Sequence, residues 1–198
     1  MFILKLAVIV ISYLIGSISP AIMICKAKYG VDIRTLGSGN AGTTNVLRNY
    51  GKKLAGITLF LDAIKGIVCY FAGYLVFDSY EIGLACGLAA VIGHIFPIYY
   101  GFKGGKGVAT TMGLCVVAVP KAAAVAVIAA LIIMAVSRRI SLGSLLGIVI
   151  FTVYTVVMGY SPFVIIWALI ITVIIWIKHR GNIKRLLSGT EPKFSLKK

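Results

Sequence analysis

Acidic residues are scarce in this 198-residue chain, in which five aspartates and glutamates stand against 20 lysines and arginines. The five acids are dispersed, so they do not form the carboxylate cluster that Mg²⁺ or Ca²⁺ requires. The two histidines and four cysteines show no C-x-x-C pair and no spacing typical of zinc. The sequence therefore predicts no metal and no cofactor, and the cysteines are interpreted as small buried hydrophobes.

Charged residues of both signs are also few, at 13% against 60% hydrophobic residues, and the mean hydropathy is +1.03. A soluble domain of this size needs more polar surface to cover its core. We therefore expect one all-α, polytopic membrane domain over residues 1–198. The net charge of +15 comes from bases that flank apolar runs, which favours anionic lipids or substrates as partners over nucleic acid.

Seven stretches approach the roughly 20 apolar residues that cross a bilayer, at 2–25, 54–77, 82–100, 108–119, 122–136, 142–158 and 162–177. The first is too long for a signal peptide and lacks a cleavage site. Only Pro120 and Lys121 separate the two short stretches, 108–119 and 122–136, so five spans is the alternative if this pair only dips into the membrane. A broken hairpin and one kinked segment both stay open for the pair.

The basic residues predict the orientation of the chain. With seven spans, nearly all of them fall on one side, which the positive-inside rule makes cytoplasmic. The N-terminus is then outside and the C-terminus inside. The outer connections are short and the inner ones long and polar, and loops on a rigid scaffold carry function. We expect the active site at the cytoplasmic face.

The first polar segment, 36–48, has three glycines within six residues, which permits tight turns with exposed N–H groups. Arg48 adds a forked cation that suits phosphate or carboxylate. A polar loop with a helix cap at Thr43 or Thr44 is the plainer alternative. The other polar side chains of the segment are Ser38, Asn40 and Asn45.

The second segment covers 93–97 and 102–110. It resembles a Walker A loop, but its first glycine is one residue too close to Gly105-Lys106, and Gly107 stands where Ser or Thr is needed, so an NTPase is not supported. Glycines before a helix still offer N–H groups to an anion beside Lys106. A flexible basic loop is the alternative. His94 lies inside an apolar span and is interpreted as a satisfied buried histidine more readily than as a catalytic one.

The third segment is 178–193. Helical spacing puts His179, Asn182 and Ile183 on one face, although a juxtamembrane helix that grips anionic lipid fits the composition too. Glu191 is expected to fix the tail against a basic neighbour rather than to do chemistry.

Two smaller polar sites complete the pattern. Asp62 and Lys65 stand three residues apart in a span, where a lone charge costs roughly 2.5–3.5 kcal/mol, so we expect them to pair. A functional and a purely structural role fit this pair equally. Ser141 is either a helix cap or a site residue, and Ser144 follows one turn later, where it would face the polar cluster.

Together these segments resemble the bacterial PlsY family, the acyl-phosphate:glycerol-3-phosphate acyltransferases. Residues 37–48 match its first motif, 93–97 with 102–110 its second, and 179–191 its third. Asp62, Lys65 and Gly66 also stand where the family carries such residues. Two departures are Thr43, where alanine is usual, and Gly181, where glutamate is usual, and position 181 receives no role.

The resemblance implies a seven-helix enzyme of the bacterial cytoplasmic (inner) membrane with no obligate protein partner. It would transfer an acyl group from acyl phosphate to the 1-hydroxyl of glycerol 3-phosphate, giving lysophosphatidic acid and phosphate in early phospholipid synthesis. The implied catalytic residues are Ser38, Arg48, Lys106, His179 and Asn182. The implied substrate-binding residues are Gly39, Asn40, Thr44, Asn45, Lys65, Gly104, Gly105, Gly107, Ser141 and Ser144. Asp62 and Glu191 are expected to be structural.

Acyl phosphate is an activated anhydride, so direct attack by the glycerol hydroxyl is expected, with cations and loop N–H groups stabilising negative charge. The donor's own phosphate is favoured over neutral His179 as the proton acceptor, because protein bases are few. An acylated Ser38 is the alternative. A transporter and a metal-dependent CDP-alcohol phosphotransferase fit less well, since the outer half is apolar and the acids are dispersed.

Overall fold

The computed structural model describes residues 1–194, and every regular element among them is a helix, as the sequence predicted. The chain forms two compact units, which meet in sequence between Ala118 and Val119. The prediction of a single domain stays a prediction, and each unit is described by itself. Unit 1 contains α1 (Phe2–Gly16), α2 (Pro20–Tyr29), η1 (Ile33–Thr35), α3 (Thr43–Tyr50), α4 (Lys52–Phe77), α5 (Tyr80–Ile95), η2 (Ile98–Tyr100) and α6 (Val108–Ala118). Unit 2 contains α7 (Pro120–Ser137), α8 (Ile140–Val157), α9 (Pro162–Lys178) and α10 (Arg180–Leu187).

Five helical segments are long and apolar enough to cross a membrane: Phe2–Tyr29, Lys52–Phe77, Tyr80–Tyr100, Pro120–Ser137 and Ile140–Val157. The pair α9 and α10, bent by 65°, makes a sixth if it counts as one span. Helix α6 is apolar but has only 11 residues. The chain is therefore a multi-pass membrane protein, while the count of seven spans stays a prediction.

The first predicted span, 2–25, is not one continuous helix. Helix α1 ends at Gly16 and α2 begins at Pro20, because proline has no N–H to donate and is favoured at the first helical position. The Ser19 hydroxyl caps α2 by accepting from the N–H of Ile22 at 3.5 Å. Helix α2 runs on past the predicted end to Tyr29.

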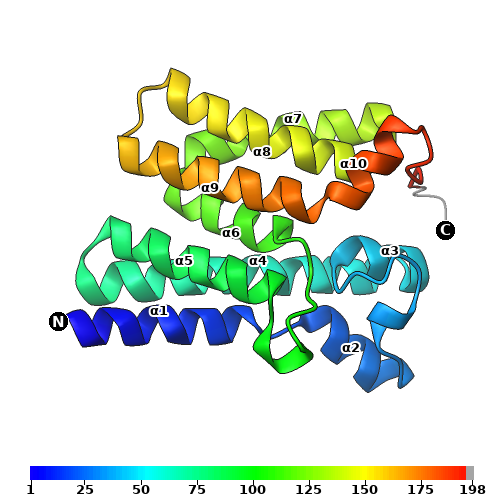
Figure 1. Ribbon diagram of the computed structural model, residues 1–198, viewed down its shortest axis with the longest axis horizontal. Coiled ribbons are helices and arrows are strands. Elements are labelled where there is room, and N and C mark those ends of the chain that lie inside the picture. Colours follow the sequence, from blue (N-terminus) through cyan, green and yellow to red (C-terminus); the bar gives the residue numbers. More distant parts are fainter. Residues whose placement is uncertain (195–198) are drawn as a thin grey trace. The chain divides into compact units, whose positions relative to one another are not determined.

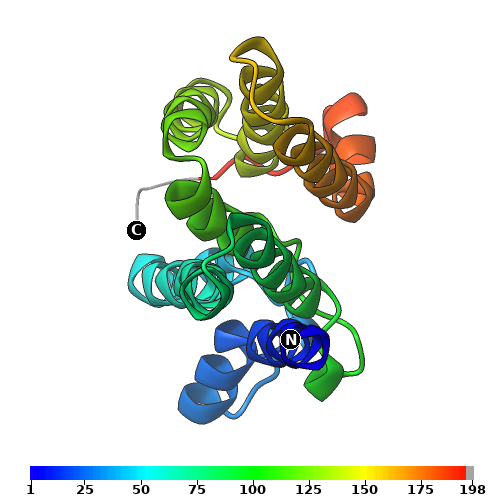
Figure 2. The same cartoon turned by 90° about the vertical axis from the view of Figure 1, so that its left-hand side faces the viewer.

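Helices α1, α4, α5 and α6 of unit 1 pack closely, as Figures 1 and 2 show for the first three of them. A side chain at Gly16 would collide with the backbone of Ala90 on α5. One at Gly66 would collide with the carbonyl of Thr110 on α6. Small residues at these crossings allow the close backbone approach that membrane helices use instead of a hydrophobic driving force.

Unit 2 is held by similar contacts. Gly143 of α8 lies against Met134 and the backbone of α7, where a Cβ would not fit. Between α8 and α9, the hydroxyls of Thr152 and Thr172 are 2.7 Å apart, so one donates to the other. These contacts align α7, α8 and α9 and leave their loops at the helix ends.

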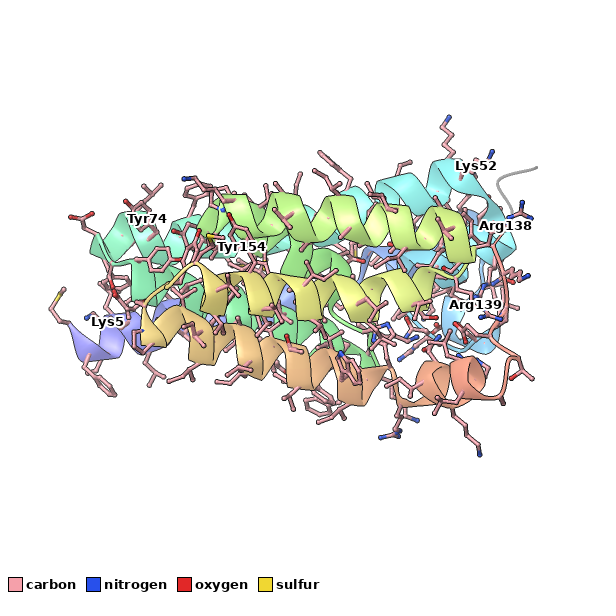
Figure 3. The ribbon with its side chains drawn as sticks, turned by 90° about the horizontal axis from the view of Figure 1, so that it is seen from above. Lys5, Lys52, Tyr74, Arg138, Arg139 and Tyr154 are labelled. Carbon is pink, nitrogen blue, oxygen red and sulfur yellow. The ribbon has the colours of Figure 1, made fainter. Side chains whose placement is uncertain are left out.

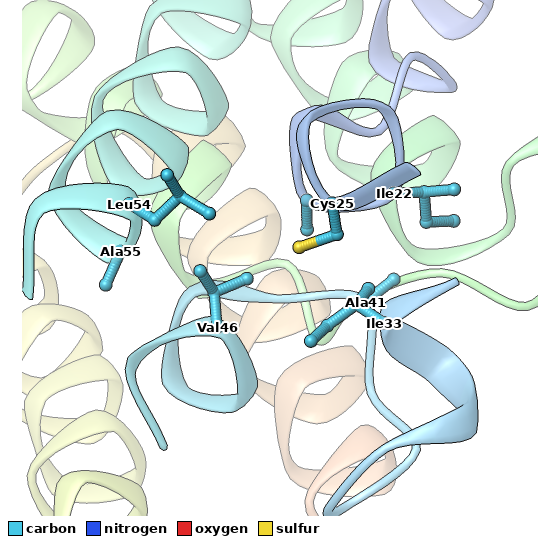
Figure 4. Packing of buried hydrophobic residues seen from close by; sticks show 8 residues of the cluster. Ile22, Cys25, Ile33, Ala41, Val46, Leu54 and Ala55 are labelled. Carbon is cyan, nitrogen blue, oxygen red and sulfur yellow. The ribbon is translucent and has the colours of Figure 1, made fainter. Parts of the chain in front are cut away.

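A small apolar core fixes the polar end of unit 1 (Figure 4). It joins α2, the segment after it, α3 and the first turn of α4. One member is Cys25, which is free and fully buried, as expected of a small hydrophobe. The members of this core are Ala21, Ile22, Cys25, Ile33, Ala41, Val46, Leu54 and Ala55.

Charge is distributed unevenly along each unit. In unit 1, Lys52 starts α4, and Tyr74 lies near the other end of this helix of 26 residues, about 39 Å long (Figure 3). In unit 2, Arg138 and Arg139 precede α8, and Tyr154 lies near its far end (Figure 3). Each unit thus has an end rich in lysine and arginine, and Tyr74 in unit 1 and Tyr154 in unit 2 lie toward the opposite end.

Candidate active site

Asn45 organises the loop of the first motif. Its side chain is buried, and its Nδ2 lies 2.9 Å from the carbonyl of Ile33, 3.0 Å from that of Leu36 and 3.1 Å from that of Asn40. Its Oδ1 accepts from the N–H of Ser38 at 3.1 Å. Because the amide's two hydrogens are already taken by carbonyls, Asn45 shapes the loop and has no donor left for a substrate.

The glycines of this loop confirm the predicted tight turns at two of three positions, and the N–H of Gly39 is used within the loop, where it donates to the carbonyl of Leu36 at 3.0 Å. Gly37 and Gly39 have φ of +53° and +69°, which other residues rarely adopt. The alternative of a helix cap at Thr43 or Thr44 is wrong, because Gly42 is the N-cap residue of α3 and both threonines are helical. Gly42 has the extended backbone that an N-cap position needs.

The loop and α3 present a polar surface. Ser38, Gly39 and Arg48 are exposed, and Asn40 and Thr44 are half-buried. Among residues 1–194, Arg48 takes part in no ion pair, and the Ser38 hydroxyl makes no hydrogen bond. Within the described part of the chain, the fold positions the Arg48 guanidinium and the Ser38 hydroxyl without using them in an ion pair or a side-chain hydrogen bond of its own.

Arg34 joins the segment before the first motif to the second motif, a contact that the sequence analysis did not predict. Its guanidinium binds Asp32 at 2.7 Å, and its Nη1 donates to the carbonyls of Tyr100 at 2.8 Å and Lys103 at 3.2 Å. Hydrogen bonds from Arg34, aided by its charge, lower the pKa of the Asp32 carboxyl despite partial burial. The Asp-x-Arg spacing was a visible signal, but the carbonyl partners lie 66 or more residues away.

The second motif folds back on the end of α5. The N–H of Gly104 donates to the carbonyl of Ile95 at 3.3 Å, and that of Gly105 donates to the carbonyl of His94 at 3.1 Å. These two amides are therefore not offered to a phosphate, contrary to the expected role of the glycines. Gly107, at φ +86°, leads directly into α6, and Lys106 before it is half-buried.

Asp62 and Lys65 pair as predicted, and His94 joins them. Lys65 Nζ lies 2.8 Å from Asp62 Oδ1, 2.8 Å from His94 Nδ1 and 3.0 Å from the carbonyl of Ile18. An ammonium has three hydrogens, and three acceptors surround it, so Lys65 is not left to bind substrate as was expected. Asp62 holds this lysine, in keeping with a structural role.

The third motif is built around Glu191. Its Oε1 accepts from the Ser141 hydroxyl and from Asn182 Nδ2, both at 2.6 Å, and its Oε2 accepts from Arg185 Nε at 2.7 Å. Arg185 is the basic neighbour that the sequence analysis expected. Burial alone would raise the pKa of Glu191, but these hydrogen bonds and the arginine charge outweigh burial and hold it below its ordinary value.

His179 lies at the 65° bend between α9 and α10, buried. Its Nδ1 is 2.8 Å from the carbonyl of Ile175, so Nδ1 carries a hydrogen and Nε2 is the basic nitrogen of the neutral ring. Ser144 donates to the carbonyl of Ile140 one turn earlier on α8, at 3.0 Å. Its oxygen therefore keeps only acceptor capacity.

The chain can now be compared with known proteins. The family model for glycerol-3-phosphate acyltransferase matches residues 6–189. A glycerol-3-phosphate acyltransferase of Finegoldia magna is 42% identical over 185 residues, which is 93% of either chain. One of Sinorhizobium fredii is 44% identical over 189 residues, covering 93% of this chain and 90% of that protein.

Two crystal structures are also similar, both of PlsY (YgiH), an integral membrane glycerol 3-phosphate acyltransferase. The glycerol 3-phosphate form has a TM-score of 0.91 at 39% identity, covering 96% of each chain. The lysophosphatidic acid form has a TM-score of 0.88 at 39% identity, covering 97% of this chain and 96% of that one. With the match over residues 6–189, these similarities place the chain in the glycerol-3-phosphate acyltransferase family, to which the integral membrane enzyme PlsY belongs.

Proposed function

We propose that this protein transfers a fatty acyl group from acyl phosphate to the 1-hydroxyl of glycerol 3-phosphate, releasing lysophosphatidic acid and inorganic phosphate. The observation that carries this proposal is the state of the carboxylates. Asp32, Asp62 and Glu191 are each bound to a basic side chain within their own unit. The two other acids are Asp78, in the turn between α4 and α5, and Glu81, in the first turn of α5.

That turn is at the far end of α4 from the first motif, so the polar end of unit 1 keeps a surplus of cations. Arg48, Lys52 and Lys53 are all exposed there. Donor and acceptor of the proposed reaction both carry phosphate, which such a surface attracts. The known forms of PlsY, with glycerol 3-phosphate and with lysophosphatidic acid, support an acceptor and a product of this kind.

The proposed chemistry is direct attack. The glycerol oxygen forms a bond to the acyl carbon, the bond from that carbon to the phosphate oxygen breaks, and phosphate leaves with the electron pair. Lys106 at the start of α6 would hold the donor's phosphate, and Arg48 with Ser38 and Asn40 that of glycerol 3-phosphate. The hydroxyl proton would pass to the departing phosphate.

His179 is the competing proton acceptor, through Nε2, because its Nδ1 is committed to the carbonyl of Ile175. An acylated Ser38 is less well supported. His94 is the histidine of unit 1, and its Nδ1 already faces Lys65 and Asp62. Within the described part of unit 1, therefore, no base stands ready to activate the Ser38 hydroxyl.

We also propose seven spans in a bacterial inner membrane, with the N-terminus outside. The basic end of each unit would be cytoplasmic by the positive-inside rule, and the opposite end, with Tyr74 in unit 1 and Tyr154 in unit 2, would lie at the outer interface. Attaching a membrane-impermeant label to single cysteines introduced at Lys53 and Glu81 of a cysteine-free variant tests this. Labelling of position 53 from outside intact cells would contradict it.

The donor is tested with the purified protein in detergent, glycerol 3-phosphate and either palmitoyl phosphate or palmitoyl-CoA. We expect release of phosphate and formation of lysophosphatidic acid with palmitoyl phosphate and neither with palmitoyl-CoA. The rate with palmitoyl phosphate should be unchanged by EDTA, since no metal is expected to take part. Turnover with palmitoyl-CoA alone would refute the donor. Arg48→Ala should raise the KM for glycerol 3-phosphate by about tenfold or more, since a charge-assisted contact contributes about 1.5–3 kcal/mol. Lys53→Ala, another exposed base on the same end, is the matched control and should change little.

A further inference from the structure

The buried cluster of Asp62, Lys65 and His94 has no part in the chemistry proposed above. The three residues are 1%, 6% and 6% exposed, inside the helices α4 and α5 of unit 1. A buried charged group is costly unless it is paired and hydrogen-bonded, so a polar cluster at this depth needs a reason. Its reason is found in what it does to the histidine ring.

The hydrogen bonds fix the form of the imidazole. Nδ1 of His94 is 2.8 Å from Lys65 Nζ and 3.1 Å from Asp62 Oδ1, and a ring nitrogen either donates one hydrogen or accepts one. If Nδ1 accepts from the ammonium, Lys65 satisfies Asp62 and His94 at once, and the cluster has no net charge. If Nδ1 carried a hydrogen, that hydrogen would face the lysine at 2.8 Å. The first arrangement leaves His94 neutral, with its hydrogen on Nε2.

The Nε2 edge of that ring faces the second motif. A Cβ placed on Gly105 would collide with Nε2 and crowd the two neighbouring ring carbons of His94. The backbone of the same two residues is already joined, because the N–H of Gly105 donates to the carbonyl of His94 at 3.1 Å. The ring is thus the surface on which the loop rests, and Lys106 is the next residue along the chain.

We propose that Asp62, Lys65 and His94 form a positioning unit for the second-motif loop. Lys65 holds the imidazole in one rotamer and one tautomer. The imidazole in turn limits how closely the backbone of Gly105 approaches α5, and this fixes the position of Lys106, the next residue. Gly105 is then required because of His94, and not because a ligand needs room or an amide there. The inference rests on the proposed function for one readout, the affinity for acyl phosphate.

A pair of substitutions separates these two reasons for the glycine. His94→Asn keeps an oxygen near the place of Nδ1 for Lys65 to donate to, but removes the ring edge that faces Gly105. Gly105→Ala adds the colliding Cβ. We expect G105A alone to raise the KM for palmitoyl phosphate by about tenfold or more, since small misplacements of positioning groups cost up to about 100-fold. In the H94N background the same change should cost less than about threefold, because the two sites are coupled.

Gly104 supplies the matched control. A Cβ there would collide with the carbonyl oxygen of His94 and crowd Pro97, so its obstacle is backbone and proline ring and not the imidazole. G104A should therefore cost the same factor with or without H94N. The KM for glycerol 3-phosphate should stay within about twofold throughout the G105A cycle, which a general loss of structure would not allow.

Thermal unfolding of the same variants gives a readout that does not depend on the donor. G105A should lower the Tm in the wild-type background and leave it nearly unchanged in H94N. An equal penalty for G105A in both backgrounds, in KM or in Tm, overturns the inference, and so does relief of G104A by H94N. Failure of the wild-type protein to use palmitoyl phosphate would instead refute the proposed donor, and the Tm cycle would still decide the inference.

Discussion

A buried carboxylate lies in each unit, Asp62 in unit 1 and Glu191 in unit 2, and their surroundings differ. Asp62 of unit 1 lies inside a membrane span, and its neighbours are a buried lysine and a buried histidine. Glu191 of unit 2 lies beyond the last helix, and its partners are two neutral side chains and Arg185, whose side chain is 40% exposed. Within a span the counter-charge has to be buried too, whereas at a helix end neutral donors and a half-exposed cation suffice.

The comparison makes the Lys65 substitution the most damaging. Lys65→Met should leave Asp62 charged and unpaired, at a cost of about 3–5 kcal/mol, and sharply reduce folded protein. The yield from size exclusion and the Tm in detergent measure it. Asp62→Asn in addition should recover part of the loss, and Lys53→Met, at an exposed position in the first turn of α4, is the control. A stable K65M protein would mean that burial of the ammonium is not what holds the cluster together.

Glu191→Gln should destabilise less. The glutamine keeps an oxygen for Ser141 and Asn182 but presents its NH₂ to Arg185, so one charge-assisted hydrogen bond, worth about 1.5–3 kcal/mol, is lost. We expect a smaller drop in Tm than for K65M. Glu81→Gln, in the first turn of α5, is the matched control. If E191Q unfolded the protein more readily than K65M, the contrast between the two carboxylates would be reversed.

The smallest expected effect is that of acid. The pKa of Glu191 is lowered in the folded protein, so its contribution to stability is full above its unfolded pKa, about 4.3, and is lost as the pH falls through the folded value. The Tm of the wild type should therefore fall more than that of E191Q between pH 6 and pH 3. The pKa of Asp32 is also lowered, but Asp32 contributes equally to the stability of the wild type and of E191Q, so it does not change the difference between them. If the Tm of the wild type and of E191Q fell by the same amount between pH 6 and pH 3, the lowered pKa of Glu191 would be contradicted.

The sequence predicted contacts between near neighbours and missed those between distant ones. Asp62 and Lys65 could be paired because residues three apart share a helix face, and Arg185 lies within reach of Glu191 along the chain. His94 joins Asp62 from 32 residues away, and no periodicity points across that distance. Pro20 is a signal for a break in the first span, but the unbroken hydrophobicity of residues 2–25 favoured one continuous span.

The glycines of the second motif could not be interpreted from sequence for a related reason. A glycine that frees an N–H for an anion and a glycine that lets the backbone pass a side chain give the same pattern. Only the hydrogen bonds of Gly104 and Gly105, and the ring of His94 beside them, distinguish the two. In the same way, the composition of the first motif indicated a polar loop. It did not indicate that the side-chain amide of Asn45 holds the two ends of that loop together.

That amide has a consequence for binding. The hydrogen-bond partners of the Asn45 side chain lie 4 to 12 residues away in sequence, so the loop closes on itself at little entropic cost and together with its own helix. The loop is therefore ordered before any ligand arrives, and the ordering of its backbone is completed during folding rather than on association. A ligand that meets Ser38 and Arg48 should bind with little penalty from loop entropy and should associate without waiting for a conformational step.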